Sequence, residues 1–130
     1  MMRYEDWTAK LNEPTPHSYK IRNGQQMLLP TAKMVDDFLR SVPKGKAVDV
    51  KMMKAQLAAA NGAEVTCPVT TGYHLRTVAE AAWLQHLNGA SLDAITPFWR
   101  VLNLKTPTTK RLACGMDFVA SQRIAEGLDA

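Results

Sequence analysis

Two cysteines, Cys67 and Cys114, are the side chains best able to form a covalent bond with a substrate. Nucleophilic catalysis by cysteine needs a thiolate with a base or a cation beside it. The two cysteines lie far apart in the sequence, form no Cys-x-x-Cys motif and have no pair of histidines at a zinc-binding spacing. We therefore expect no catalytic cysteine, no metal and no cofactor. Two isolated cysteines fit a reducing compartment, the cytoplasm.

The stretch TPFWRVLNLK, residues 96–105, places two large aromatic residues beside an arginine. As part of a ligand pocket, Phe98 and Trp99 would each stack on a base with about 1–3 kcal/mol. As core residues, each would instead bury about 150–250 Å². We favour the core for at least one of them, and structural hydrogen bonds over a phosphate contact for Arg100.

Basic residues exceed acidic ones, with 16 Lys and Arg against 12 Asp and Glu. The excess lies in residues 1–60, which hold ten basic and six acidic residues, whereas residues 61–130 hold six of each. Such a surface permits a polyanionic partner without requiring one. Four lysines of this half are candidates for phosphate contacts, and an ordinary solvated face is about equally favoured. They are Lys44, Lys46, Lys51 and Lys54.

Helical periodicity and capping residues predict the elements that would position these side chains. Helices are expected at 4–11, 31–42, 50–61, 71–88 and 116–127. Thr31 and Asp49 are the expected N-caps of the second and third, and Thr70 or Thr71 that of the long fourth helix. The expected buried positions are Met34, Val35, Phe38, Leu39, Met53, Leu57, Ala60, Leu75, Val78, Ala79, Ala82, Phe118, Val119 and Ile124.

The first 29 residues are expected to form an extension to a domain that spans 30–130. Within them, YKIRNGQQMLL alternates weakly and holds an Asn-Gly turn signal, which favours a strand or an arm. The N-terminus has no apolar signal core, and no run reaches the roughly 18 apolar residues of a membrane span. We expect no membrane association.

Four stretches carry a resemblance to a known family by their order and spacing: FLRSVPKGKAVDV, LRTVAEA, ITPFWRVLN and QRIAEGL. Together they make residues 28–127 similar to the C-terminal DNA-binding domain of the alkylguanine-DNA alkyltransferases. LRTVAEA resembles the recognition helix of that family, and ITPFWRVLN resembles its Ile-Pro-Cys-His-Arg-Val-Ile motif. The resemblance implies that Arg76 stands where the family's arginine fills the gap left by a flipped base. The alternative for Arg76 is a solvated pair with Glu80, worth about 0.2–0.5 kcal/mol.

Where this sequence departs from the family, it lacks the residues that transfer the alkyl group. Phe98 stands at the position of the nucleophilic cysteine and Trp99 at that of the activating histidine; neither offers a nucleophile or a basic nitrogen. Val50 replaces the tyrosine that helps to rotate the damaged nucleotide. The chain therefore resembles the alkyltransferase-like proteins, which bind alkylated DNA without repairing it, although those usually keep the histidine and the tyrosine.

The expected fold is mainly α, a winged-helix-like helix-turn-helix domain with little β structure, in which the aromatic segment pairs as a small wing. The expected function is non-catalytic binding of double-stranded DNA, including DNA with alkylated or modified bases. The alternative is a small module that binds a protein or a ligand on the same scaffold. The expected DNA contacts are Arg76, Lys44, Lys46, Lys51 and Thr71. The expected pocket residues are Phe98, Trp99, Arg100 and Val50.

Overall fold

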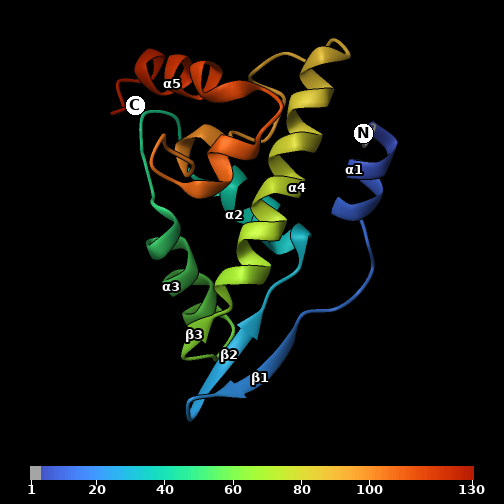
Figure 1. Cartoon of the computed structure of the whole chain (residues 1–130), viewed down its shortest axis with the longest axis vertical. Helices are drawn as coiled ribbons and strands as arrows, with labels where there is room; N and C mark the ends of the chain where they lie inside the picture. The colour runs from blue at the N-terminus through green and yellow to red at the C-terminus, as the bar shows by residue number, and fades with distance from the viewer. Residues whose placement is uncertain (1–3) are drawn as a thin grey trace.

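The computed structural model describes residues 4–130, with side chains from residue 6 onward. The chain is mainly α-helical with a small sheet, as the sequence predicts (Figure 1). In chain order its elements are α1 (Tyr4–Leu11), β1 (Ser18–Arg22), β2 (Gln25–Leu29), α2 (Ala32–Ser41), α3 (Val50–Ala60), β3 (Val65–Thr66), α4 (Pro68–Leu87), the 3₁₀ helices η1 (Phe98–Arg100) and η2 (Pro107–Arg111), and α5 (Gly115–Ala125).

The sheet begins with an antiparallel hairpin of β1 and β2, closed by Asn23 and Gly24. Both turn residues lie in the left-handed region, with φ of 52° and 76°. A two-residue hairpin turn requires that conformation, and Asn-Gly adopts it readily. β2 then pairs in parallel with β3, with Leu28 opposite Thr66. The strand that the Asn-Gly signal predicted is confirmed.

Side-chain caps fix the starts of the helices. The Thr31 hydroxyl accepts from the Met34 N–H at 3.1 Å, and the Asp49 carboxylate accepts from the Met52 N–H at 2.7 Å. Both predicted caps are therefore confirmed. The predicted cap of α4 is wrong, because Cys67 occupies that position and Pro68 opens the helix. Proline suits a first helical turn, where its fixed φ is helical and no N–H is needed.

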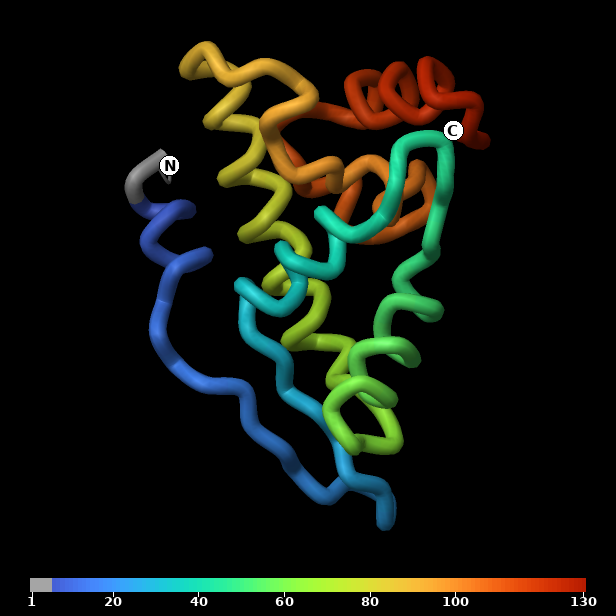
Figure 2. Tube along the Cα trace, turned by 180° about the vertical axis from the view of Figure 1, so that it is seen from behind, coloured from blue at the N-terminus to red at the C-terminus, as the bar shows by residue number. Residues whose placement is uncertain are grey.

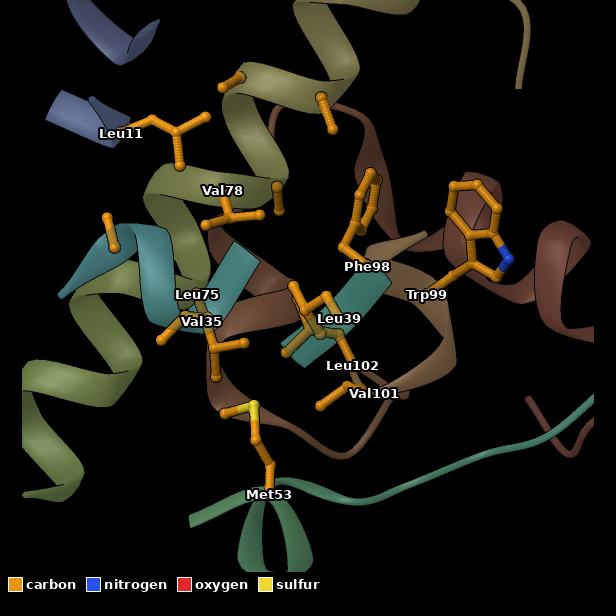
Figure 3. Packing of buried hydrophobic residues seen from close by; sticks show 14 of the residues in the cluster. Leu11, Val35, Leu39, Met53, Leu75, Val78, Phe98, Trp99, Val101 and Leu102 are labelled. Atoms are coloured by element: carbon orange, nitrogen blue, oxygen red, sulfur yellow. The ribbon is translucent and has the colours of Figure 1, made fainter. Parts of the chain in front are cut away.

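Helix α4 runs through the centre of the molecule, with α1 on one side and α3 on the other (Figures 1 and 2). Its Leu75 and Val78 lie beside Val35 of α2 in the core (Figure 3). Most of the predicted buried positions of α2, α3 and α4 are buried, and Met34 and Phe38 are partly so. Two predicted positions are wrong: Ala60 is exposed, and Ile124 on α5 is 65% exposed.

The predicted N-terminal extension contributes side chains, within its described residues, to the same hydrophobic core as the rest of the chain. Trp7 and Leu11 of α1 pack into it, and so does Leu28 of β2. α1 lies along α4, and β2 is joined to β3. Four apolar side chains of this predicted extension are buried, Trp7, Leu11, Met27 and Leu28, so it packs against the domain that follows it.

The predicted wing is absent from the described residues. The segment that contains Phe98 and Trp99 is a buried 3₁₀ helix, not a strand. The three strands of the described residues all come before α4 in the chain, whereas the segment predicted as a wing comes after it. A wing lies on the surface and would expose these two large aromatic rings to water. Their burial in the core explains why the segment folds inward.

Candidate nucleic-acid interface

The N-terminal half of α4 presents an open face. The stripe of Thr71, Leu75 and Val78 is buried against the core. Positions 69, 73 and 76 fall on another face, where Val69 is 77% and Tyr73 is 52% exposed. Helical periodicity separates the two faces, since residues four and seven apart share a side. A partner that approaches this half of α4 from solvent therefore meets Val69, Tyr73 and Arg76.

Arg76 lies between α1 and the rest of this face. Its guanidinium is 5.5 Å from the ring centroid of Trp7, and its Nε is 3.6 Å from Oε2 of Glu80. Its side chain is 42% exposed. Glu80 is almost fully buried, and its other oxygen accepts from the Ala113 N–H at 3.1 Å. The predicted pair with Glu80 is present, and it leaves part of the guanidinium open to solvent.

A hollow of about 600 Å³ opens beside Arg76, between α1, α4 and η2. We call it the α4 groove, and it is lined by Trp7, Lys10, Pro68, Val69, Gly72, Tyr73, Arg76, Pro107, Thr108 and Arg111. Three of these side chains are cationic and none is a carboxylate. The groove is therefore a place where negative charge is attracted.

A second hollow of about 510 Å³ adjoins the α4 groove and shares Pro68, Gly72, Pro107 and Thr108 with it. We call it the Val50 hollow, because Val50, the first residue of α3, lies in its wall. It adds Lys54 and Lys105 and again no carboxylate. Among residues 4–130, neither of these two lysines nor Arg111 forms an ion pair.

Thr71 does not reach this surface. It is 1% exposed, and its hydroxyl is buried without a hydrogen-bond partner among the described residues. The predicted DNA contact at Thr71 is wrong, because the residue lies one helical turn before Leu75, on the buried stripe.

Lys44 and Lys46 are exposed, but they lie in the loop between α2 and α3. This loop contacts the end of α5, where the Gly45 N–H donates to Oε1 of Glu126 at 3.1 Å. It lies across the molecule from α1, which Arg76 contacts (Figure 1). Lys51 is exposed on the first turn of α3. The predicted flanking of Arg76 by Lys44 and Lys46 is therefore wrong.

Phe98 and Trp99 do not line a pocket. They are 0% and 2% exposed, and their rings meet edge to face at 5.3 Å (Figure 3). Each also lies near the ring of Phe118, at 6.1 and 6.0 Å. The predicted pocket role is wrong for both, and the core alternative holds for both. The indole N–H of Trp99 donates to Oε2 of Glu126 at 2.7 Å.

Arg100 has the structural role that was favoured for it. Its Nε donates to Oε1 of Glu126 at 2.8 Å, and its Nη1 donates to the Val42 carbonyl at 2.9 Å. Burial alone would raise the pKa of Glu126, but hydrogen bonds from Arg100, Trp99 and Gly45 outweigh it and hold that pKa below its ordinary value. The Glu126 carboxylate thus connects the end of α5 to the loop before α3 and to the aromatic segment.

The two cysteines lie in different surroundings, and their pKa values shift in opposite directions. Burial, with the Glu80 carboxylate nearby, raises the pKa of Cys114 to about 12, so its thiol is protonated at neutral pH. Burial would also raise the pKa of Cys67, but hydrogen bonds from the first turn of α4 outweigh it and lower that pKa. Cys67 is only 8% exposed. Within residues 4–130, no three His, Cys, Asp or Glu side chains gather closely enough to hold a metal ion.

Comparison of the chain with protein-family models, with curated proteins and with solved structures finds no match in any of the three. Among the helices of residues 4–130, none combines the length and the apolar character that crossing a bilayer requires.

Several residues of this surface were not predicted from the sequence. Tyr73 and Val69 carried a signal, since they share a face with Arg76 at helical spacing. Lys10, Arg111 and Lys105 carried none, because only tertiary packing brings α1 and η2 to the start of α4.

Proposed function

We propose that the protein is a non-catalytic DNA-binding protein that meets its target with the N-terminal half of α4. The observation that supports this most is charge. Five cations, Lys10, Lys54, Arg76, Lys105 and Arg111, line two adjoining hollows that no carboxylate lines. Phosphate contacts from such side chains supply most of the affinity of proteins for DNA.

The resemblance to the alkyltransferase DNA-binding domain adds the expected target, double-stranded DNA with alkylated or modified bases. In this proposal α3 and α4 act as a helix-turn-helix without the predicted wing, with α4 as the recognition helix. A recognition helix contacts bases with its N-terminal residues, and the open face of α4 lies in that half. Two free cysteines are compatible with a cytoplasmic location.

Catalysis is not part of the proposal, because Phe98 and Trp99 occupy the positions of the family's cysteine and histidine. Neither side chain can attack an alkyl group or activate a nucleophile. Both rings instead fill the core.

Fluorescence anisotropy tests the proposal with a plain duplex and a duplex that contains one alkylguanine, each at two salt concentrations. We expect affinity to fall as salt rises, with a slope of about −0.9 per phosphate contact. A tighter complex with the alkylguanine duplex supports recognition of the modified base. If the protein binds neither duplex at low salt, the alternative of a protein- or ligand-binding module replaces the proposal.

A further inference from the structure

Tyr73 is the exposed aromatic side chain of the α4 groove. It is 52% exposed. Lys10 donates a hydrogen bond to its hydroxyl, and the Lys10 ammonium is 4.9 Å from the ring centroid. This bond orients the side chain, and about half of the residue stays exposed to solvent although the ring of His74 lies 5.6 Å away. A ring held in this way is a platform for another planar group.

The cations of the groove surround this platform. Arg76 and Arg111 line the same hollow as Tyr73. Arg76 forms one ion pair, at 3.6 Å to Glu80, and its Nε is buried, but its side chain is 42% exposed, so the outer part of the guanidinium can reach a ligand. Arginine donors match phosphate oxygens in geometry as well as in charge.

The size of the groove limits what it can hold. Its volume of about 600 Å³ lies within the usual range for small ligands, roughly 300–1,000 Å³. A base within an intact duplex stays stacked between its neighbours and cannot lie on Tyr73; only an unpaired base has a free face.

We propose that the α4 groove binds one nucleotide unit, with the base on Tyr73 and the phosphate near Arg76 and Arg111. A free nucleotide and an unpaired residue of a strand share this chemistry. The inference rests on the proposed DNA binding, and it adds a preference for an unpaired nucleotide over a perfect duplex.

The experiment compares four probes by anisotropy or by competition against a labelled strand: free dAMP, free dTMP, an intact duplex, and the same duplex with one bulged nucleotide. Tyr73→Leu removes the platform, and Tyr19→Leu, at a 41% exposed tyrosine on β1, is its control. Arg111→Gln removes a groove cation. Its control is Lys110→Gln, which removes the same charge from the neighbouring exposed residue outside the groove.

We expect the wild type to bind the bulged duplex, or the free nucleotides, more tightly than Tyr73→Leu does by about 5- to 150-fold. Arg111→Gln should weaken the same complexes, and both controls should bind as the wild type does. Binding of the free nucleotides alone identifies a small-molecule site, and a preference for the bulge alone identifies a site for a strand.

Two results would overturn the inference and leave the proposed function standing. In one, the protein binds the intact duplex but neither prefers the bulge nor binds nucleotides. In the other, Tyr73→Leu and Arg111→Gln bind all probes as tightly as their controls. If no probe binds at low salt, both proposals fail. Tyr73 is half exposed, so a thermal melt of Tyr73→Leu close to that of the wild type excludes unfolding as the cause.

Discussion

The guanidinium of Arg76 lies over the indole ring of Trp7, with its Cζ 5.5 Å from the ring centroid. This contact joins the first helix of the chain to the central one. Because Trp7 is itself buried in the core, the position of Arg76 depends on α1 as much as on α4. The N-terminal helix is thus part of the candidate DNA surface.

Replacement of Arg76 by Gln should weaken duplex binding by about 1–3 kcal/mol and make the salt slope shallower by roughly one unit. The free energy of unfolding should fall as well, since Glu80 is almost fully buried and loses its cationic partner. Anisotropy at several salt concentrations, with a denaturation curve for each protein, measures both.

The control for this variant is Lys46→Gln. Lys46 is exposed in the loop across the molecule from α1, so its loss should change neither the affinity nor the slope. An equal loss of affinity in Lys46→Gln and Arg76→Gln would contradict the interface described here.

Replacement of Phe98 or Trp99 by Ala should destabilise the protein by about 3–5 kcal/mol in each case, because both rings are fully buried. Chemical denaturation measures the change. Ile124→Ala is the matched control, since Ile124 is 65% exposed and should contribute little. A loss below about 1 kcal/mol at either ring would show that it faces an open pocket.

Incubation with benzylguanine or with a methylated duplex should leave the mass of the intact protein unchanged. Cys114 has a pKa of about 12 and stays protonated, and Cys67 is buried at the start of α4. Phe98→Cys should also fail to give rapid transfer, because Trp99 is no general base. A stoichiometric alkyl adduct on the wild type, detected by mass spectrometry, would refute the non-catalytic proposal.

Replacement of Glu126 by Gln should cost about 2 kcal/mol at neutral pH, since charged hydrogen bonds from Arg100 and a bond from Trp99 are weakened. The pKa of Glu126 is lowered in the folded protein, so its contribution is fully present above the ordinary value of 4.5 and is lost as pH falls through the lower folded pKa. The unfolding free energies of the two proteins should therefore converge below pH 4.5.

Denaturation curves at neutral pH and on either side of that value measure this convergence. Asp93→Asn, at an exposed carboxylate, is the control and should follow the wild type throughout. A constant difference between Glu126→Gln and the wild type at all pH values would show that the charge of Glu126 is not what stabilises the fold.

Local signals in the sequence were enough to predict several elements. Thr31 and Asp49 cap their helices, and Asn23–Gly24 turns the hairpin, because each acts on backbone groups within three residues. The start of α4 was missed for a local reason as well. Cys67 is a weak cap compared with Thr70 or Thr71, but Pro68 already fixes the first helical turn.

The candidate site was harder to predict, because it depends on contacts between distant segments. Thr71 was assigned to the surface although its spacing from Leu75 places it on the buried stripe. The groove needs Lys10 from α1 and Arg111 from η2, which no local pattern connects. The aromatic segment was predicted in part: burial was favoured for at least one of Phe98 and Trp99 and holds for both, whereas the pocket role and the wing were wrong.

The Glu126 carboxylate also constrains the order in which the chain can complete its fold during synthesis. It accepts hydrogen bonds from Gly45, Trp99 and Arg100, all of which precede α5 in the chain. Arg123 on the same helix donates to the Trp99 carbonyl at 2.8 Å. A nascent chain therefore lacks these hydrogen bonds until α5 has been synthesised, although the loop before α3 and the aromatic segment precede that helix in the chain.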